Sequence, residues 1–349
     1  MNKFRTLPLP PAGPAWFPAT MGTGILASLL QLHESRIPGA SLAAVAVLIV
    51  AWSIFLGLVV ASCWNIRVWW DSVREFSTMP FLATVSMGML SIGSATALVV
   101  SAQWPAYADL AWAIDAVMWW CATIIGVATA LGFSARLIGV DRGAPTPVWG
   151  LAVVSPMVSA TTGAGLSGVS SAQWAVTIHM VSTACFYLSL FVGVLIFFRA
   201  YQQHFVIAPI PIPASASSWI PLGVVGQSTA AAQALAFRTD GAVAEIYGGQ
   251  VHVMANMYGW LMFVIGIPLV GLAVVVTLRG FYLRMPFSPG WWALTFPVGT
   301  LALGATWLAQ GTGHEWLTHL GALVTVGLVG TVSVCCGASV VAVVHYKNA

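Results

Sequence analysis

The chain has 349 residues and a formal net charge of +3, yet only 6% of its residues are charged and 59% are hydrophobic. With a mean hydropathy of +0.91, its average side chain prefers lipid to water, which excludes an ordinary soluble globular protein. The sequence therefore predicts a multi-pass protein of the cell membrane. Its expected partner is the lipid bilayer, and we expect no nucleic acid.

The N-terminal segment and the cysteines narrow the class further. Prolines rather than an apolar core follow the short basic start MNKFR, so we expect the first helix to be retained and not cleaved as a signal peptide. The five cysteines lie in apolar stretches without a C-x-x-C pair, which is unfavourable for a disulfide framework or a thiolate metal site. We expect no metal and no cofactor.

A membrane span needs about 20 predominantly apolar residues, and the sequence contains ten such stretches. They lie near 14–32, 41–66, 78–101, 108–135, 146–166, 172–198, 219–237, 250–277, 289–309 and 316–344. The longest connection, near 199–218, is rich in proline and serine, which is typical of a linker. We therefore predict an all-α fold of ten transmembrane helices that forms a single transport domain over residues 1–349.

The twelve lysines and arginines indicate the orientation of these spans. If both ends of the chain and every second loop face one side, that side holds Lys3, Arg5, Arg67, Arg74, Arg136, Arg142, Arg199, Arg279, Arg284 and Lys347. The other side keeps Arg36 and Arg238. Because cytoplasmic loops carry an excess of Lys and Arg, this distribution predicts an even number of spans with both termini in the cytoplasm.

Proline is concentrated in the odd-numbered spans. All five contain proline, and small residues follow each of the prolines Pro18, Pro80, Pro156, Pro221 and Pro297. A proline inside a helix removes a backbone donor and kinks the helix, and lipid tolerates this only where protein or water restores the lost partner. The repeat predicts five kinked inner helices around a path, backed by five outer helices. The alternative is that proline and small residues simply serve close helix packing.

The same five spans contain no Asp, Glu, Lys, Arg or His. A path for cations would be expected to carry carboxylates or carbonyl-rich loops. An anion can instead be held by hydroxyls, freed N–H groups and the positive ends of helices. The neutral spans therefore favour a small inorganic or organic anion that binds weakly, and uncharged solutes remain the alternative.

Four segments carry a resemblance to a known family: AWFPATMGTGIL at 15–26, WGLAVVSPMVSATTG at 149–163, PLGVVGQSTA at 221–230 and PFSPGWWALTFPVGTLAL at 286–303. They resemble the tellurite-resistance/dicarboxylate transporter family, which includes TehA-type proteins, plant slow anion channels, fungal malate permeases and fungal sulfite exporters. The ten-span pattern extends this resemblance over nearly the whole chain. The GTG and GQS pieces are similar to the malate and sulfite branches.

The resemblance implies five helical hairpins in a quasi-fivefold array around a central pore, and commonly a homotrimer with one path per subunit. It also implies a phenylalanine gate on the ninth helix, which by position is Phe296. Such a ring can block a path as a dry constriction and swing aside, whereas ordinary core packing is the alternative for it. The implied substrates are sulfite, C4-dicarboxylates such as malate, and monovalent anions, with tellurite resistance as a side effect.

The expected pore lining consists of proline, small, hydroxyl-bearing and amide residues of the odd-numbered spans. These are Pro18, Gly22, Thr23, Gly24, Pro80, Pro156, Thr161, Thr162, Pro221, Gln227, Ser228, Pro297 and Gly299. No basic residue among them could clamp two carboxylates, which favours sulfite and monovalent anions over malate. Trp291 and Trp292, at the start of the ninth span, are interpreted as anchors at the membrane interface.

Asp115 and His179 are ionisable residues within the fourth and sixth spans. Such residues are costly inside a membrane and often functional, so the two suggest a proton-coupled dicarboxylate or sulfite carrier as the alternative to a channel. A contact within a hairpin or between subunits is an equally reasonable interpretation. A haem protein with His179 and His252 as axial ligands is a third hypothesis, and we expect no enzyme activity.

Overall fold

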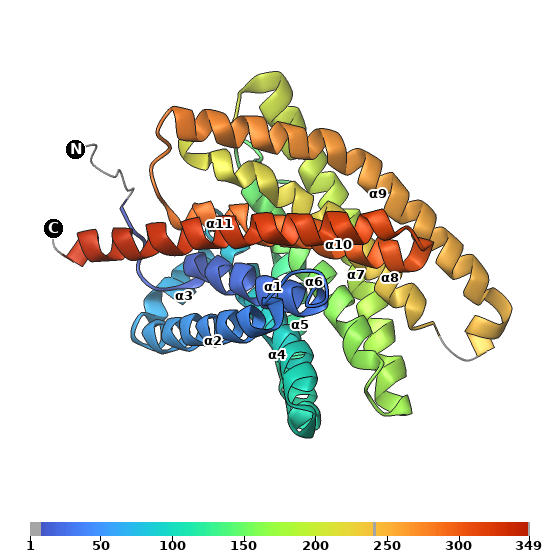
Figure 1. Cartoon of the computed structure of the whole chain (residues 1–349). Coiled ribbons are helices and arrows are strands. Elements are labelled where there is room, and N and C mark those ends of the chain that lie inside the picture. Colours follow the sequence, from blue (N-terminus) through green and yellow to red (C-terminus); the bar gives the residue numbers. More distant parts are fainter. Residues whose placement is uncertain (1–7, 240–241, 348–349) are drawn as a thin grey trace.

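The computed structural model describes residues 8–239 and 242–347, and the long elements within these ranges are helices. They are α1 (Pro18–Leu32), α2 (Ala40–Trp64), α3 (Ile66–Arg74), α4 (Leu82–Gln103), α5 (Ala108–Ala135), α6 (Leu151–Ser167), α7 (Ala172–Gln202), α8 (Ile220–Phe237), α9 (Ala242–Tyr282), α10 (Phe296–Thr312) and α11 (Glu315–Lys347). Figure 1 shows them gathered in one bundle. The prediction of an all-α fold is confirmed for the described residues.

Seven helical segments of the described chain are long and apolar enough to cross a membrane. They are Ala40–Trp64, Met79–Gln103, Pro105–Ala135, Ala172–Ile207, Gly249–Tyr282, Pro289–Thr312 and Glu315–Val344. The helices α1, α6 and α8, with 15, 17 and 18 residues, fall outside this set. The chain is therefore a multi-pass helical membrane protein, with seven segments that qualify as spans on their own.

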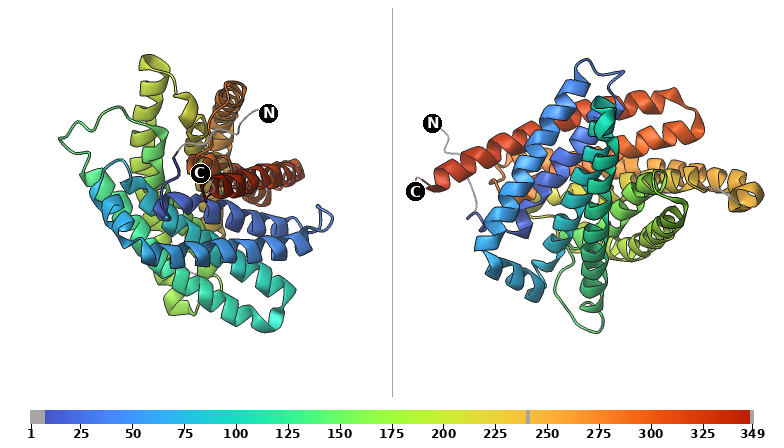
Figure 2. Two further views of the ribbon diagram at one scale, coloured as in Figure 1. Left: turned by 90° about the vertical axis from the view of Figure 1, so that its left-hand side faces the viewer. Right: turned by 90° about the horizontal axis from the view of Figure 1, so that it is seen from below.

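Five helices form a closed ring of contacts, which we call the inner ring. In this ring α1 packs on α4, α4 on α6, α6 on α8 and α8 on α10, and α10 returns to α1. Each of the helices α2, α5, α7, α9 and α11 packs against two neighbouring members of the inner ring. Figures 1 and 2 show two of these outer helices, α2 and α9, on opposite flanks of the bundle.

Burial separates the two sets of helices. In Met79–Gln103 and Pro289–Thr312, which contain α4 and α10, 78% of the most apolar stretch is buried, compared with 17% in Ala40–Trp64 and Gly249–Tyr282. The helices α1, α6 and α8 are buried along almost their whole length. The outer helices expose many large apolar side chains, as a surface in contact with lipid requires. The inner ring is thus the core of the molecule.

The prolines of the inner ring lie mostly at helix starts. Pro18 is the first residue of α1, Pro221 and Pro297 are the second residues of α8 and α10, and Pro80 lies in a 3-10 turn directly before α4. First-turn positions suit proline because an N–H group there has no helical partner. The prediction of proline-kinked helices is therefore wrong for these four residues. Pro156, inside α6, is the one of the five that fits it.

Glycines permit the closest contacts within the inner ring. A Cβ atom added to Gly226 in α8 would collide with the backbone of Thr300 in α10, and one added to Gly304 would lie 2.6 Å from the carbonyl oxygen of Gly226. A Cβ atom at Gly24 in α1 would lie 2.8 Å from the side chain of Ser91 in α4. Small residues at these places let helix backbones approach one another as they do in other membrane bundles.

Candidate functional site

A cavity of about 70 Å³ lies where the five helices of the inner ring begin. We call it the central cavity. Its wall is formed by Pro18, Met21, Phe81, Met87, Val148, Leu151, Val154, Ser217, Ile220, Gly223, Pro289, Gly290, Trp292, Ala293, Phe296 and Pro297. Every inner helix, or the turn that leads into it, contributes to this wall. Because the cavity is small and every inner helix contributes to its wall, we call this level of the inner ring a constriction.

The start of each inner helix adds a positive potential to the central cavity. The first residues Pro18, Leu151, Ile220 and Phe296 of four helices line it, and so does Phe81, which directly precedes α4. None of these five helix starts has a side-chain hydrogen bond that caps it. A 3-10 turn precedes each of them, and carbonyl oxygens of that turn accept hydrogen bonds from backbone N–H groups where the helix begins. A helix N-terminus carries about half a positive charge because the peptide dipoles align along the helix axis. None of the lining residues is charged, so the cavity combines neutral walls with a field that favours anions.

Phe296 occupies this wall because the chain breaks its helical course directly before it. A 3-10 segment, Pro289–Leu294, ends at Thr295, whose hydroxyl donates a hydrogen bond of 2.7 Å to the carbonyl oxygen of Trp292. The helix α10 then begins at Phe296, which is 3% exposed. The helix break thus holds an aromatic ring at the narrow part of the inner ring.

The central cavity includes three of the residues predicted for the path. These are Phe296, Pro18 and Pro297. Pro221 lines a different pocket, on the outer side of α8. Ser228 accepts a hydrogen bond of 2.9 Å from the hydroxyl of Tyr258 on α9, so its side chain is engaged with an outer helix.

The predicted glycines lie at helix contacts outside the wall of the central cavity. A Cβ atom at Gly22 would collide with the side chain of Thr295, and one at Gly299 would lie 2.8 Å from Ile25. Gly24 faces α4, as described above. These three residues allow α1 to approach α10 and α4, so they shape the inner ring rather than line this cavity.

Two predicted threonines and two prolines also lie away from the cavity wall. The hydroxyls of Thr23 and Thr162 donate hydrogen bonds of 2.8 and 2.9 Å to carbonyl oxygens one turn earlier in their own helices. Pro80 and Pro156 are buried in the helical core. The hydroxyls of the two threonines are thus satisfied within their own helices.

Thr161 and Gln227 lie further along α6 and α8 than the central cavity. The hydroxyl of Thr161 donates to the carbonyl oxygen of Met157 at 3.2 Å and to that of Gln227 at 3.4 Å. Gln227 is buried, and its Oε1 atom has no hydrogen-bond partner in the described parts of the chain. An unpaired buried amide oxygen is costly in free energy. The part of the inner ring at Thr161 and Gln227 is therefore a second polar position along the predicted path.

The predicted proton-coupling residues lie on outer helices. Asp115, on α5, is 1% exposed, and neither carboxylate oxygen has a hydrogen-bond partner among residues 8–239 and 242–347. Its side chain faces α4, because a Cβ atom at Gly93 would lie 2.7 Å from Oδ1. His179 is half-buried on α7.

The interpretation of Trp291 and Trp292 as interface anchors is wrong. They are 7% and 2% exposed. Trp291 Nε1 donates a hydrogen bond of 3.0 Å to the carbonyl oxygen of Pro286, and Trp292 Nε1 donates one of 3.1 Å to Ser339 of α11. Trp292 also lines the central cavity. Trp292 lies two residues after Gly290, in the irregular segment between Pro289 and Pro297. This position in the sequence indicates a buried side chain rather than an interface anchor.

Side-chain amides connect the C-terminal parts of α8 and α10 to the N-terminal half of α9. Gln233 Nε2 donates to Asn256 Oδ1 at 2.9 Å, and Asn256 Nδ2 donates to the carbonyl oxygen of Gly311 at 2.9 Å. Because each amide satisfies another buried group, the network holds an outer helix to two helices of the inner ring.

Replacement of Asn256 by leucine is expected to lower the free energy of unfolding by about 1–3 kcal/mol, because it leaves the buried Gln233 amide without its acceptor. Thermal melting of the purified protein in detergent measures this. The matched control is Gln173→Leu at an exposed position of α7. Equal melting temperatures for the two variants would show that the network contributes no stability.

The ring of helices around a neutral constriction defines a multi-pass membrane protein of the channel and transporter class. The family model SLAC1, described as voltage-dependent anion channel, matches residues 12–340, and the chain belongs to this family. It is accordingly an anion transport protein of the cell membrane. The resemblance drawn from the four sequence segments is confirmed.

Individual relatives agree with this family. The chain is 25% identical over 350 residues to a sulfite efflux pump of Trichophyton rubrum, covering 96% of this chain and 90% of the relative. It is 25% identical over 354 residues to a sulfite efflux pump of Arthroderma benhamiae, with the same coverage. An uncharacterized transporter of Methanocaldococcus jannaschii is 23% identical over 319 residues, covering 88% of this chain and 87% of the relative. These relatives point away from enzyme activity.

Proposed function

We propose that the chain conducts a small oxoanion of the sulfite type, or a small monovalent anion, through the centre of the inner ring, with Phe296 as the gate. The central cavity carries this proposal: the starts of five helices converge on one neutral constriction that contains a buried aromatic ring. Such a site attracts an anion without holding it tightly, because no fixed cation pairs with it. The similarity to sulfite efflux pumps supports sulfite as the substrate.

We further propose ten membrane crossings, in which α1, α6 and α8 cross together with the seven apolar segments. The closed contacts of the inner ring support a quasi-fivefold array of hairpins. The distribution of lysines and arginines supports cytoplasmic termini, although Lys3 and Arg5 lie outside the described residues. The central cavity would then lie toward the cytoplasmic side, where the inner helices begin. A homotrimer is proposed from the family resemblance.

Anion flux in proteoliposomes tests the proposed substrate. Sulfite, nitrate, chloride and malate are compared at two pH values, with protein-free liposomes as the control. We expect sulfite and monovalent anions to pass faster than malate, because the lining offers no pair of cations for two carboxylates. Malate flux above that of sulfite would contradict the proposed selectivity.

A proton-coupled carrier is the second candidate, and the buried, unpartnered carboxylate of Asp115 favours it. If coupling runs through this group, Asp115→Asn is expected to abolish uptake driven by a proton gradient while anion exchange without a gradient continues. Asp109→Asn, at an exposed position of the same helix, serves as the control. Unchanged gradient-driven uptake in Asp115→Asn would exclude this role for Asp115.

A further inference from the structure

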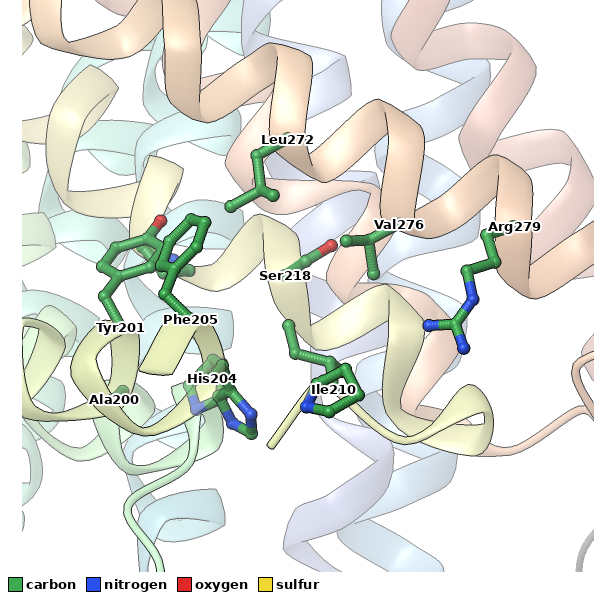
Figure 3. A pocket seen from close by; sticks show the side chains of 12 residues that line it. Ala200, Tyr201, His204, Phe205, Ile210, Ser218, Leu272, Val276 and Arg279 are labelled. Carbon is green, nitrogen blue, oxygen red and sulfur yellow. The ribbon is translucent and has the colours of Figure 1, made fainter. Parts of the chain in front are cut away.

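A second pocket lies outside the inner ring, between the end of α7 and the last turns of α9. It has a volume of about 160 Å³ and is lined by twelve residues, some of them from the turn η5 (Gln203–Ile207) that follows α7. Figure 3 shows Tyr201, His204 and Phe205 on one side, Leu272 and Val276 on the other, and Arg279 at one end. We call it the lateral pocket. It is apolar along its length and basic at this end.

Two polar atoms of the lateral pocket lack partners. The hydroxyl of Tyr201 and Nε2 of His204 are buried and have no hydrogen bond in the part of the chain that the structure describes. Nδ1 of His204 lies 3.1 Å from the carbonyl oxygen of Ala208, which fixes the ring in place. Because an unpaired buried polar group is costly, these atoms indicate that the pocket is built to hold a polar ligand group.

The charge of the residues that line the lateral pocket indicates that the ligand is negatively charged. Arg279 is exposed in the last turn of α9, and none of the twelve lining residues is acidic. A guanidinium matches the geometry of a phosphate, with which it forms paired charge-assisted hydrogen bonds. The tyrosine hydroxyl and the free ring nitrogen of the histidine can take part in hydrogen bonds with further polar atoms of such a ligand.

The position of the lateral pocket selects the kind of molecule. Arg279 is the first charged residue after a long apolar run in α9, and His204 follows the apolar part of α7. Both therefore lie where two membrane segments end, at the level of lipid headgroups. The neighbouring Phe205, Val206 and Ile207 are exposed, as residues that contact the edge of the hydrocarbon would be.

We propose that the lateral pocket binds the phosphate headgroup of an anionic membrane lipid. Arg279 holds the phosphate at its end of the pocket, Leu272 and Val276 contact the start of the acyl chain, and the Tyr201 hydroxyl and His204 offer hydrogen bonds to polar headgroup atoms at the other end. A soluble phosphate anion shares the headgroup chemistry but cannot use the apolar wall.

A bound lipid would also touch the inner ring. Ser218 and Pro221 line the lateral pocket, whereas Ser217 and Ile220 line the central cavity. Consecutive residues at the start of α8 thus separate the two spaces. Resting on the proposed function, this adjacency makes lipid occupancy a means of adjusting the constriction.

Binding is measured on the full-length protein in zwitterionic nanodiscs or mild detergent, by native mass spectrometry and by thermal melting during titration with phosphatidylglycerol. Phosphatidylcholine and inorganic phosphate are the comparison ligands. We expect phosphatidylglycerol to be retained and to raise the melting temperature, with neither comparison ligand matching it. Equal stabilisation by inorganic phosphate would overturn the lipid assignment, since the acyl chain would then contribute nothing.

Two variants locate the binding to the lateral pocket. Arg279→Gln is expected to weaken phosphatidylglycerol binding about tenfold, because it removes the charged partner of the phosphate. Leu272→Trp, which fills the apolar wall, is expected to weaken it as well. The matched control Arg199→Gln, at an exposed position of α7 outside the pocket, is expected to bind like wild type. Wild-type binding by both pocket variants would reject the proposal, and none of these readouts depends on anion flux.

Discussion

Phe296→Ala is expected to raise the rate of anion flux about tenfold or more. The ring forms part of the wall of a constriction of about 70 Å³, so its removal widens this part of the inner ring. A tenfold faster flux corresponds to an activation barrier that is lower by about 1.4 kcal/mol. This decrease is small compared with the free-energy cost of moving an anion past a dry aromatic ring. Stopped-flow measurement of sulfite and chloride flux in proteoliposomes checks this.

Phe133→Ala is the matched control for this prediction. Phe133 is fully buried and stacks on Phe76 with ring centroids 4.7 Å apart, but it does not line the central cavity. Its truncation is expected to cost stability without raising flux, since large-to-small changes in a core cost about 3–5 kcal/mol. If Phe296→Ala loses stability in the same way and gains no flux, its ring is an ordinary core residue.

Gly226→Ala is expected to lower the free energy of unfolding by about 1–3 kcal/mol, as overpacking a tight core does. The added methyl group would collide with the backbone of Thr300, which cannot turn aside as a flexible side chain can. The added methyl group would push α8 and α10 apart. Since both helices contribute to the wall of the central cavity, this displacement is also expected to alter the rate of anion flux. Thermal melting and the flux assay report the two effects independently.

Gly271→Ala provides the comparison for the glycine prediction. Gly271 lies on α9, and no atom of the described residues beyond the neighbouring backbone of its own helix lies within 4 Å of the position that a Cβ atom would take. Alanine is intrinsically the better helix former by about 1 kcal/mol, so this variant is expected to be as stable as wild type or slightly more so. Equal stability of the two alanine variants would mean that the contact between α8 and α10 is loose enough to accept a methyl group.

The alternation between buried and exposed helices could be predicted from the sequence, because it has a chemical cause. Segments such as PATMGTG place small and hydroxyl residues where helices meet, whereas the outer segments carry long apolar side chains for lipid. The place of Phe296 in a helix break was likewise predictable, since Pro289, Gly290 and Pro297 interrupt any continuous helix across this region.

The details of the cavity wall were not predictable in the same way. The sequence favours hydroxyl and amide side chains for the path, whereas the wall of the central cavity includes apolar residues such as Met21, Met87 and Val154. The direction that a side chain takes around a helix depends on the register between helices, which the composition of one helix does not specify. The composition also does not reveal that the hydroxyls of Thr23 and Thr162 donate hydrogen bonds within their own helices.

The short length of α1, α6 and α8 has a consequence for biogenesis. Helices that are short, or interrupted by polar and small residues, gain little when the translocon offers them to the bilayer one at a time. Their insertion is then expected to depend on the strongly apolar helix that follows each of them, namely α2, α7 and α9, so that the unit of insertion is the hairpin and not the single helix. A polar substitution on the lipid face of an outer helix would accordingly misplace the inner helix before it, and quality control would remove a chain whose transport path was itself unaltered.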